Sequence, residues 1–160
     1  MVSESILNLR RNLREIADHL NLSARVEEYL ACYFVDVELG GAGEASPEDL
    51  IGAALQHFRL GELRPLRQPA IALYTPDFDR HGWHSPHTVI DVVTDDMPFL
   101  VDSITLLVYR HGLVIHRLLH PLLGAERDAA GRLQRSLPRG APGSQPESWI
   151  HLEIDRIGDS

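Results

Sequence analysis

The sequence contains no lysine, a single cysteine and no long apolar segment. All 15 basic residues of the 160 are arginines, which stay protonated, so no amine side chain can act as a base. One cysteine, Cys32, excludes an internal disulfide, and its apolar neighbours indicate a buried thiol. No run approaches the roughly 18 apolar residues of a membrane helix, and the first ten residues do not resemble a signal peptide. We therefore predict a cytoplasmic protein with no membrane partner.

Charge and composition narrow the class further. The net charge is -8, and the arginines are scattered among 23 acidic residues. A nucleic-acid interface requires clustered cations that displace counterions from phosphates, so we predict no nucleic-acid partner. With 44% hydrophobic residues, the chain can bury one ordinary core.

Residues 1–65 have the pattern of a helical subdomain. A helical apolar stripe, open to docking on the rest of the fold or to self-association, is formed by Ile6, Leu9, Leu13, Ile16 and Leu20. Ser23 is placed to cap a second helix, and Ser46 followed by Pro47 opens a third. The prolines in segment 64–69 then end the helical pattern.

The remainder of the chain reads as strands around one helix. We predict strands at the alternating segments 70–75 and 88–94, and a helix at 100–112. The segment 113–126 is predicted as one strand that enters a hairpin with its turn at 128–131 and its return at 133–137, and 148–157 as the last strand. Within the second strand Asp91 is the polar exception, which we place near solvent or an arginine at the sheet margin.

Two segments carry a resemblance to a known family. D-D-M-P-F-L-V-D-S at 95–103 and E-S-W-I-H-L-E-I-D-R at 147–156 resemble the first ACT-like domain of the large bacterial NAD-specific glutamate dehydrogenases. The resemblance implies an α+β fold, with a helical subdomain at 1–65 and an incomplete antiparallel ACT-like sheet of ferredoxin type (βαββ) at 70–160. Its second helix and last strand are expected after Ser160. We expect the N-terminal helices or a second copy of the chain to cover the sheet surface that this second helix would protect.

The same resemblance implies a non-catalytic regulatory or assembly module. The intact enzyme oxidises glutamate to 2-oxoglutarate and ammonium through lysines, so a segment without lysine holds no catalytic residue. The sequence Gly41-Ala-Gly43-Glu-Ala-Ser46 is an incomplete dinucleotide fingerprint with no strand before it, so no cofactor is expected here and NAD would bind elsewhere. The expected partners are other domains of the same polypeptide and further copies in a homo-oligomer. The alternative is a stand-alone amino-acid-binding or protein-interaction ACT module.

The candidate ligand site is the turn made by Asp95, Asp96, Met97, Pro98 and Phe99. In amino-acid-binding ACT domains this turn resembles D-x-P-G-L, in which the glycine opens the backbone to a ligand. Phe99 takes the glycine position, which favours an assembly surface over a sensor for an amino-acid effector. Asp96 has two alternative roles, as a helix cap or as a ligand contact.

The histidines give no metal prediction. His81, His84 and His87 recur every three residues, but Gly82 and Pro86 exclude the helix that would align them. We therefore expect a solvated loop and no metal site.

Overall fold

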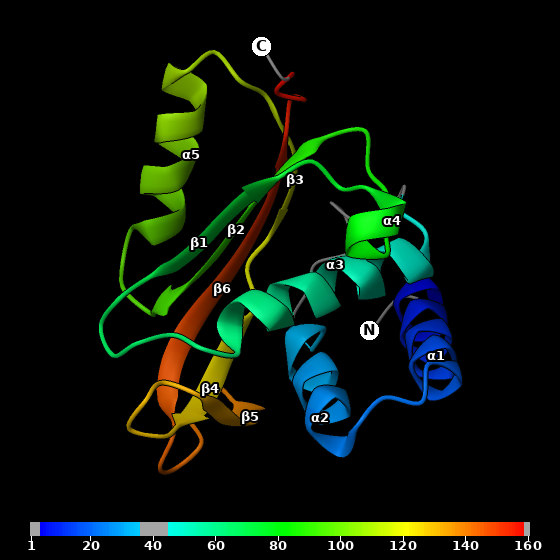
Figure 1. Ribbon diagram of the computed structural model, residues 1–160, viewed down its shortest axis with the longest axis vertical. Coiled ribbons are helices and arrows are strands. Elements are labelled where there is room, and N and C mark those ends of the chain that lie inside the picture. Colours follow the sequence, from blue (N-terminus) through cyan, green and yellow to red (C-terminus); the bar gives the residue numbers. More distant parts are fainter. Residues whose placement is uncertain (1–3, 36–44, 159–160) are drawn as a thin grey trace.

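The computed structural model describes residues 4–35 and 45–158, with side chains from residue 11 onward. The fold is α+β, as predicted, with three helices before the main strands (Figure 1). In chain order the elements are α1 (Glu4–His19), α2 (Ala24–Tyr33), α3 (Pro47–Gly61), β1 (Ala70–Tyr74), α4 (Phe78–His81), β2 (Thr88–Asp95), α5 (Leu100–Arg110), β3 (Ile115–Leu119), β4 (Leu122–Arg127), β5 (Leu133–Pro138) and β6 (Gln145–Ile154). Gly41, Gly43 and the side chains of Ile6 and Leu9 lie outside the described residues.

The predicted helix starts are confirmed. Ser23 caps α2 by accepting a hydrogen bond from the Val26 amide at 3.4 Å, and Ser46 caps α3 by accepting one from the Asp49 amide at 3.1 Å. Pro47 occupies the first turn of α3, where its missing N–H breaks no intrahelical hydrogen bond.

The sheet is antiparallel throughout, in the order β1-β2-β6-β4-β5, with β3 paired to β6 beyond β4. The single strand predicted over 113–126 is wrong, because the structure has β3 and β4 separated by His120 and Pro121. Pro121 has no N–H to continue the ladder, although its carbonyl still accepts a hydrogen bond from the Trp149 amide at 2.9 Å. The last strand begins earlier than predicted, because residues 145–148 pair with β4.

Strand β1 lies along the outer edge of β2, in the place that the last strand of a βαββαβ sheet takes. β2 therefore has a hydrogen-bonded neighbour on each side, β1 and β6. In this sheet β1, which precedes the βαβ unit, therefore occupies the position that we expected a strand after Ser160 to fill.

Alternate side chains of β6 face opposite layers of helices. Trp149 lies in a core cluster with residues of α2, α3, β2, β4 and β5, whereas Ile150, Leu152 and Ile154 pack with α5. Helix α1 docks on α3, since Leu13 packs with Leu50. Of the two alternatives for the α1 stripe, docking on the fold is therefore the one observed. The predicted regions 1–65 and 70–160 share one core.

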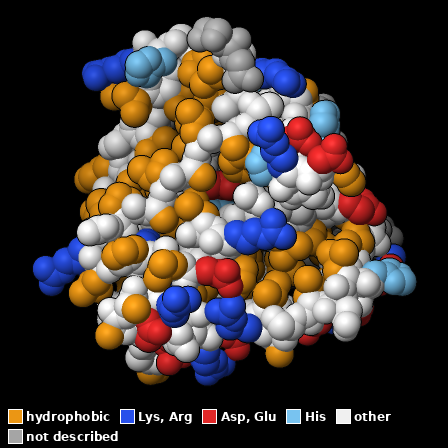
Figure 2. Space-filling view, in the orientation of Figure 1, with side chains coloured by type: hydrophobic (Ala, Val, Ile, Leu, Met, Phe, Trp, Pro, Cys, Tyr) orange, Lys and Arg blue, Asp and Glu red, His pale blue; other side chains and the backbone are white. Residues whose placement is uncertain are grey.

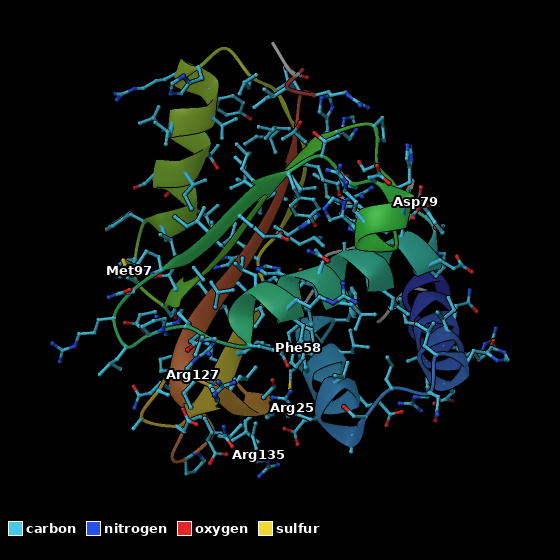
Figure 3. All side chains as sticks on the ribbon, in the orientation of Figure 1. Arg25, Phe58, Asp79, Met97, Arg127 and Arg135 are labelled. Atoms are coloured by element: carbon cyan, nitrogen blue, oxygen red, sulfur yellow. The ribbon has the colours of Figure 1, made fainter. Side chains whose placement is uncertain are left out.

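The helical layer is also joined to the sheet by polar contacts. Arg25 of α2 lies over the Phe58 ring of α3, 5.3 Å from its centroid, and donates a hydrogen bond to the carbonyl of Leu133 on β5 at 2.7 Å (Figure 3). Glu28 of α2 accepts a hydrogen bond from the Ser136 amide at 3.0 Å. These contacts fix the position of α2 against the end of the sheet.

The N-terminal helices cover the sheet face opposite α5. They leave the α5 side of the edge strand β1 exposed, where Ile71 is 62% and Leu73 60% accessible. The expectation that these helices protect the surface beside the single ACT-like helix is therefore wrong. The physical reason is that α3 lies on the face of the sheet opposite α5. Its apolar side therefore packs on Trp149 and Val93.

Candidate functional site

The predicted ligand turn projects its apolar side chains outward. Phe99 stands at the start of α5 with φ 64°, a left-handed conformation that non-glycine residues rarely adopt. Phe99 is 77% exposed, and Met97, two residues before it, is 48% exposed (Figure 3). The phenylalanine thus adopts a glycine-type backbone conformation and still presents its ring to solvent.

Asp96 does not cap α5. The residue at the N-cap position of α5 is Phe99, and no side chain there accepts a hydrogen bond from the first turn of the helix. The Asp96 carboxylate instead accepts hydrogen bonds from Ser148 at 2.9 Å and Arg139 at 3.1 Å. The capping interpretation is therefore wrong, because three residues separate Asp96 from the helix and its carboxylate turns to β6.

Asp95 is held by a buried arginine that comes from the helical side. Arg64, whose side chain is 3% exposed, donates to Asp95 at 2.8 Å and to Glu147 at 2.7 Å. Arg127 of β4 makes a two-point contact with the same Glu147, through Nε at 2.8 Å and a terminal nitrogen at 3.0 Å (Figure 3). Both acids of the turn are thus already paired with arginines, which weakens their attraction for the amino group of a ligand.

Exposed apolar side chains lie on the turn and on the two elements beside it in the fold, β1 and α5. We call this group the α5 surface; its members are apolar side chains at least 48% exposed on β1, the turn and α5, namely Ile71, Leu73, Met97, Phe99, Leu106, Leu107 and Tyr109. Figure 2 shows hydrophobic side chains gathered over this side of the molecule, on the left of the view. Exposed apolar side chains that gather on one side of a protein are a recognised mark of an interaction surface.

The opposite face of the same strands holds a buried polar cluster. Asp91 of β2 is 1% exposed and lies across the β2–β6 ladder from His151. Their hydrogen bond, from His151 Nδ1 to Asp91 Oδ1, is 2.6 Å long, and His151 Nε2 lies 3.1 Å from Glu153. The prediction of Asp91 at a sheet margin is therefore wrong: β2 is central, and the face that Asp91 shares is covered by α3.

The pKa values of this cluster follow from burial and from the paired charges. Burial alone would lower the pKa of His151, but the charges and hydrogen bonds of Asp91 and Glu153 outweigh it and raise that pKa to about 9. Burial would raise the pKa of Glu153, yet His151, Ser85 and Arg117 bring it down to about 2. His151 is thus an imidazolium that donates to two carboxylates.

His57 of α3 completes the cluster in the neutral form. Its Nε2 lies 3.0 Å from the carbonyl of Val92, which can only accept, so the proton is on Nε2. Its Nδ1 then accepts from the Tyr33 hydroxyl at 2.9 Å and faces Asp91 at 3.7 Å. Burial lowers the pKa of His57, in agreement with this assignment.

The charges of the cluster balance. Two carboxylates, Asp91 and Glu153, are matched by the His151 imidazolium and by Arg117, which donates to Glu153 at 2.7 Å. The buried hydroxyl of Ser85 donates to Glu153 at 2.7 Å, and Tyr74 lies 3.4 Å from Asp91. A buried network of this kind is tolerated because its polar groups find partners.

The histidines singled out in the sequence point to different partners. His81 Nδ1 accepts from the Asp77 amide at 2.9 Å, whereas His87 stacks on His116 with ring centroids 4.0 Å apart. Among residues 4–35 and 45–158, the group whose ligand atoms converge is instead His57, Asp91 and His151, within 4.8 Å of one another. Sequence reasoning missed this group.

One signal in the sequence could have found part of the cluster. Asp91 interrupts the apolar middle of β2, and His151 and Glu153 alternate with apolar residues in the second half of β6. Polar residues at the same alternating phase of two central strands must meet one another or a cation. His57 gives no comparable signal, because its approach depends on how α3 crosses the sheet.

Fold and site together define an ACT-like α+β domain, with a βαβ unit at its centre and no lysine for dehydrogenase chemistry. The chain belongs to the family described as the ACT1 domain of glutamate dehydrogenase, which it matches over residues 29–160. This segment is an ACT1 domain and not the catalytic region of such an enzyme. No solved structure gave a significant match.

Curated relatives support the family assignment. The chain is 37% identical over 145 residues to the NAD-specific glutamate dehydrogenase of Pseudomonas aeruginosa, covering 88% of this chain and 9% of the relative. It is 34% identical over 159 residues to that of Halomonas elongata, covering 96% and 10%, and 32% identical over 125 residues to that of Mycobacterium tuberculosis, covering 74% and 7%. The chain therefore spans a tenth or less of each relative's length. Among the described helices, none is long and apolar enough to cross a membrane.

Proposed function

We propose that this chain is a non-catalytic assembly module of a cytoplasmic NAD-specific glutamate dehydrogenase. It binds other domains of the same polypeptide through the α5 surface. The observation that carries the proposal is Phe99, which combines a left-handed backbone with a 77% exposed ring. The enzyme's chemistry, from glutamate to 2-oxoglutarate and ammonium with NAD, belongs to other parts of the polypeptide.

Backbone strain supports a use of Phe99 outside this chain. A left-handed conformation costs a non-glycine residue about 1–2 kcal/mol. An exposed ring recovers little of that cost by packing within the domain. Such strain persists where a residue serves a contact or a ligand, and an apolar ring is suited to an apolar protein surface.

The polar groups of the turn argue against an amino-acid sensor at this position. Asp95 and Asp96 are paired with Arg64 and Arg139, so an incoming ammonium group would have to displace an arginine. Phe99 stands where the ligand-binding form of the turn has glycine. The occupant that we propose is another domain of the enzyme, because each relative contains about ten times as much chain as this domain.

The decisive experiment places Phe99→Ser and Leu107→Ser together in the full-length enzyme. We expect faster proteolytic release of this domain and slower glutamate oxidation, because the proposed contact joins two domains of one polypeptide. The matched control is Phe78→Ser on α4, which removes a ring that is 68% exposed on a different part of the molecule and should change none of these readouts. Wild-type proteolysis and rate in the double variant would refute the assembly role.

A second experiment tests the alternative, a regulatory module with an amino-acid effector. The 160-residue chain is screened by thermal shift against the common amino acids and 2-oxoglutarate. A ligand at a hundredfold its dissociation constant stabilises a fold by about 2.7 kcal/mol, which such a screen detects. A shift that disappears in Asp96→Ala would replace the assembly proposal by a sensor; the absence of any shift agrees with assembly.

A further inference from the structure

We propose that His57, Asp91 and His151 form a buried binding site for one divalent cation of the zinc class. The three residues come from three elements, α3, β2 and β6, and one donor atom of each lies within 4.8 Å of the others. The Nδ1 atoms of His57 and His151 lie 3.7 and 2.6 Å from the same Asp91 oxygen. Two imidazoles and a carboxylate are a donor set typical of zinc.

The groups around this site hold the two imidazoles in the orientation that a metal requires. In both rings Nδ1 faces the shared centre while Nε2 is engaged on the far side. The acceptor for His57 is the carbonyl of Val92 at 3.0 Å, and for His151 it is the carboxylate of Glu153 at 3.1 Å. In metal sites, the second ring nitrogen of a histidine ligand almost always donates a hydrogen bond to a carbonyl, a carboxylate or a water in this manner.

A cation at this centre replaces a proton. His151 Nδ1 now donates a hydrogen bond to Asp91, so it must release that proton to solvent as the metal–nitrogen bond forms. His57 Nδ1 already has a lone pair, which now accepts a hydrogen bond from the Tyr33 hydroxyl at 2.9 Å. A cation that takes this lone pair ends the hydrogen bond from Tyr33, so the hydroxyl would have to turn its proton away and present an oxygen lone pair before it could supply the fourth ligand. The bound cation would join α3 to both central strands.

The first measurement uses the wild-type chain and cobalt(II), a spectroscopic substitute for zinc. Because all three ligands are 1% exposed or less, the metal is supplied during refolding from urea rather than added to the folded protein. We expect one cobalt per chain after dialysis and the intense visible absorption of a four-coordinate site, and we expect that absorption to be lost when excess zinc is present during refolding. No retained metal, or only the weak absorption of a six-coordinate surface ion, would overturn the proposal.

The metal ligands are identified by NMR, by comparing the imidazole nitrogen signals of the zinc-loaded and metal-free wild-type chain. We expect the Nδ1 signals of His57 and His151 to move while those of His87 and His116 stay in place; movement of the surface pair alone would refute the site. Asp91→Asn should abolish metal retention, and Glu153→Gln should weaken it about 10–100-fold. The matched control, His87→Gln with His116→Gln, removes a half-buried and an exposed imidazole that stack on each other and should retain one metal per chain.

Discussion

The two faces of the central strands β2 and β6 are built on different principles. The face toward α3 combines large aromatic side chains with a buried cluster of charges and is covered by helices and by the loop that carries Trp83. The face toward α5 is purely apolar in its core, and the edge strand beside that core remains exposed. The first face is therefore complete within this chain, whereas the second has an apolar margin suited to a partner.

This difference predicts unequal consequences of mutation on the two faces. Asp91→Ala removes one carboxylate from the buried cluster and leaves the His151 imidazolium with a single acceptor. Breaking a buried ion pair in this way costs about 3–5 kcal/mol of folding free energy. Urea unfolding in the presence of a chelator, which excludes any contribution from bound metal, measures the effect.

The matched control for this change is Asp79→Ala on α4, an exposed acid (Figure 3). Surface substitutions of this kind alter stability by no more than about 0.5 kcal/mol. Equal urea midpoints for the two variants would show that the buried cluster does not hold the helical face together.

Close packing on the α3 face gives the next largest effect. The α-carbon of Gly61 lies so near the Trp149 ring that an added Cβ would overlap it. We expect Gly61→Ala to destabilise the chain by about 1–3 kcal/mol through overpacking, measured by thermal or urea unfolding. Gly158→Ala has open space around its Cβ and should leave stability unchanged; a neutral Gly61→Ala would show that Trp149 can shift.

Sequence patterns predicted the α5 face better than the α3 face. Alternation in β2 and β6 and the 100–112 helix pattern describe an apolar face correctly, because burial of apolar side chains depends only on periodicity. The cluster on the α3 face depends on His57, which approaches Asp91 only because of the way α3 crosses the sheet. Arg64 likewise reaches Asp95 and Glu147 from a segment that the sequence identifies only as a boundary.

The candidate turn shows the same limit at a finer scale. The position of the strand-to-helix junction and the outward direction of Phe99 agree with an assembly surface, but the capping role of Asp96 does not occur. A side-chain cap requires a polar side chain such as Asp or Ser at the residue directly before the helix. The sequence pattern predicted the helix at 100–112, but it could not show that the residue before it, Phe99, adopts a left-handed conformation.

The strain at Phe99 can be measured by a pair of substitutions in the 160-residue chain. Both Phe99→Gly and Phe99→Ala remove the exposed ring, but glycine adopts a positive φ without steric cost. We expect the glycine variant to be more stable than the alanine variant by about 0.5–1 kcal/mol in urea unfolding. Equal stabilities would mean that the left-handed backbone stores no strain, and the support that Phe99 gives to the assembly proposal would be lost.

The smallest effect is expected on the exposed margin of the α5 face. Leu107 is 57% exposed, so Leu107→Ala should change the stability of the isolated chain by no more than about 0.5 kcal/mol. Leu152→Ala is the matched change at a fully buried position of the same face, and it should cost about 2–5 kcal/mol because it opens a cavity. Urea unfolding of both variants measures the contrast. A large loss from Leu107→Ala in the isolated chain would show that this leucine is part of the domain's own core, so that the α5 surface would be smaller than we infer. A small loss there, combined with weaker assembly of the full-length enzyme, would indicate that Leu107 contributes its apolar area to a contact made outside this domain.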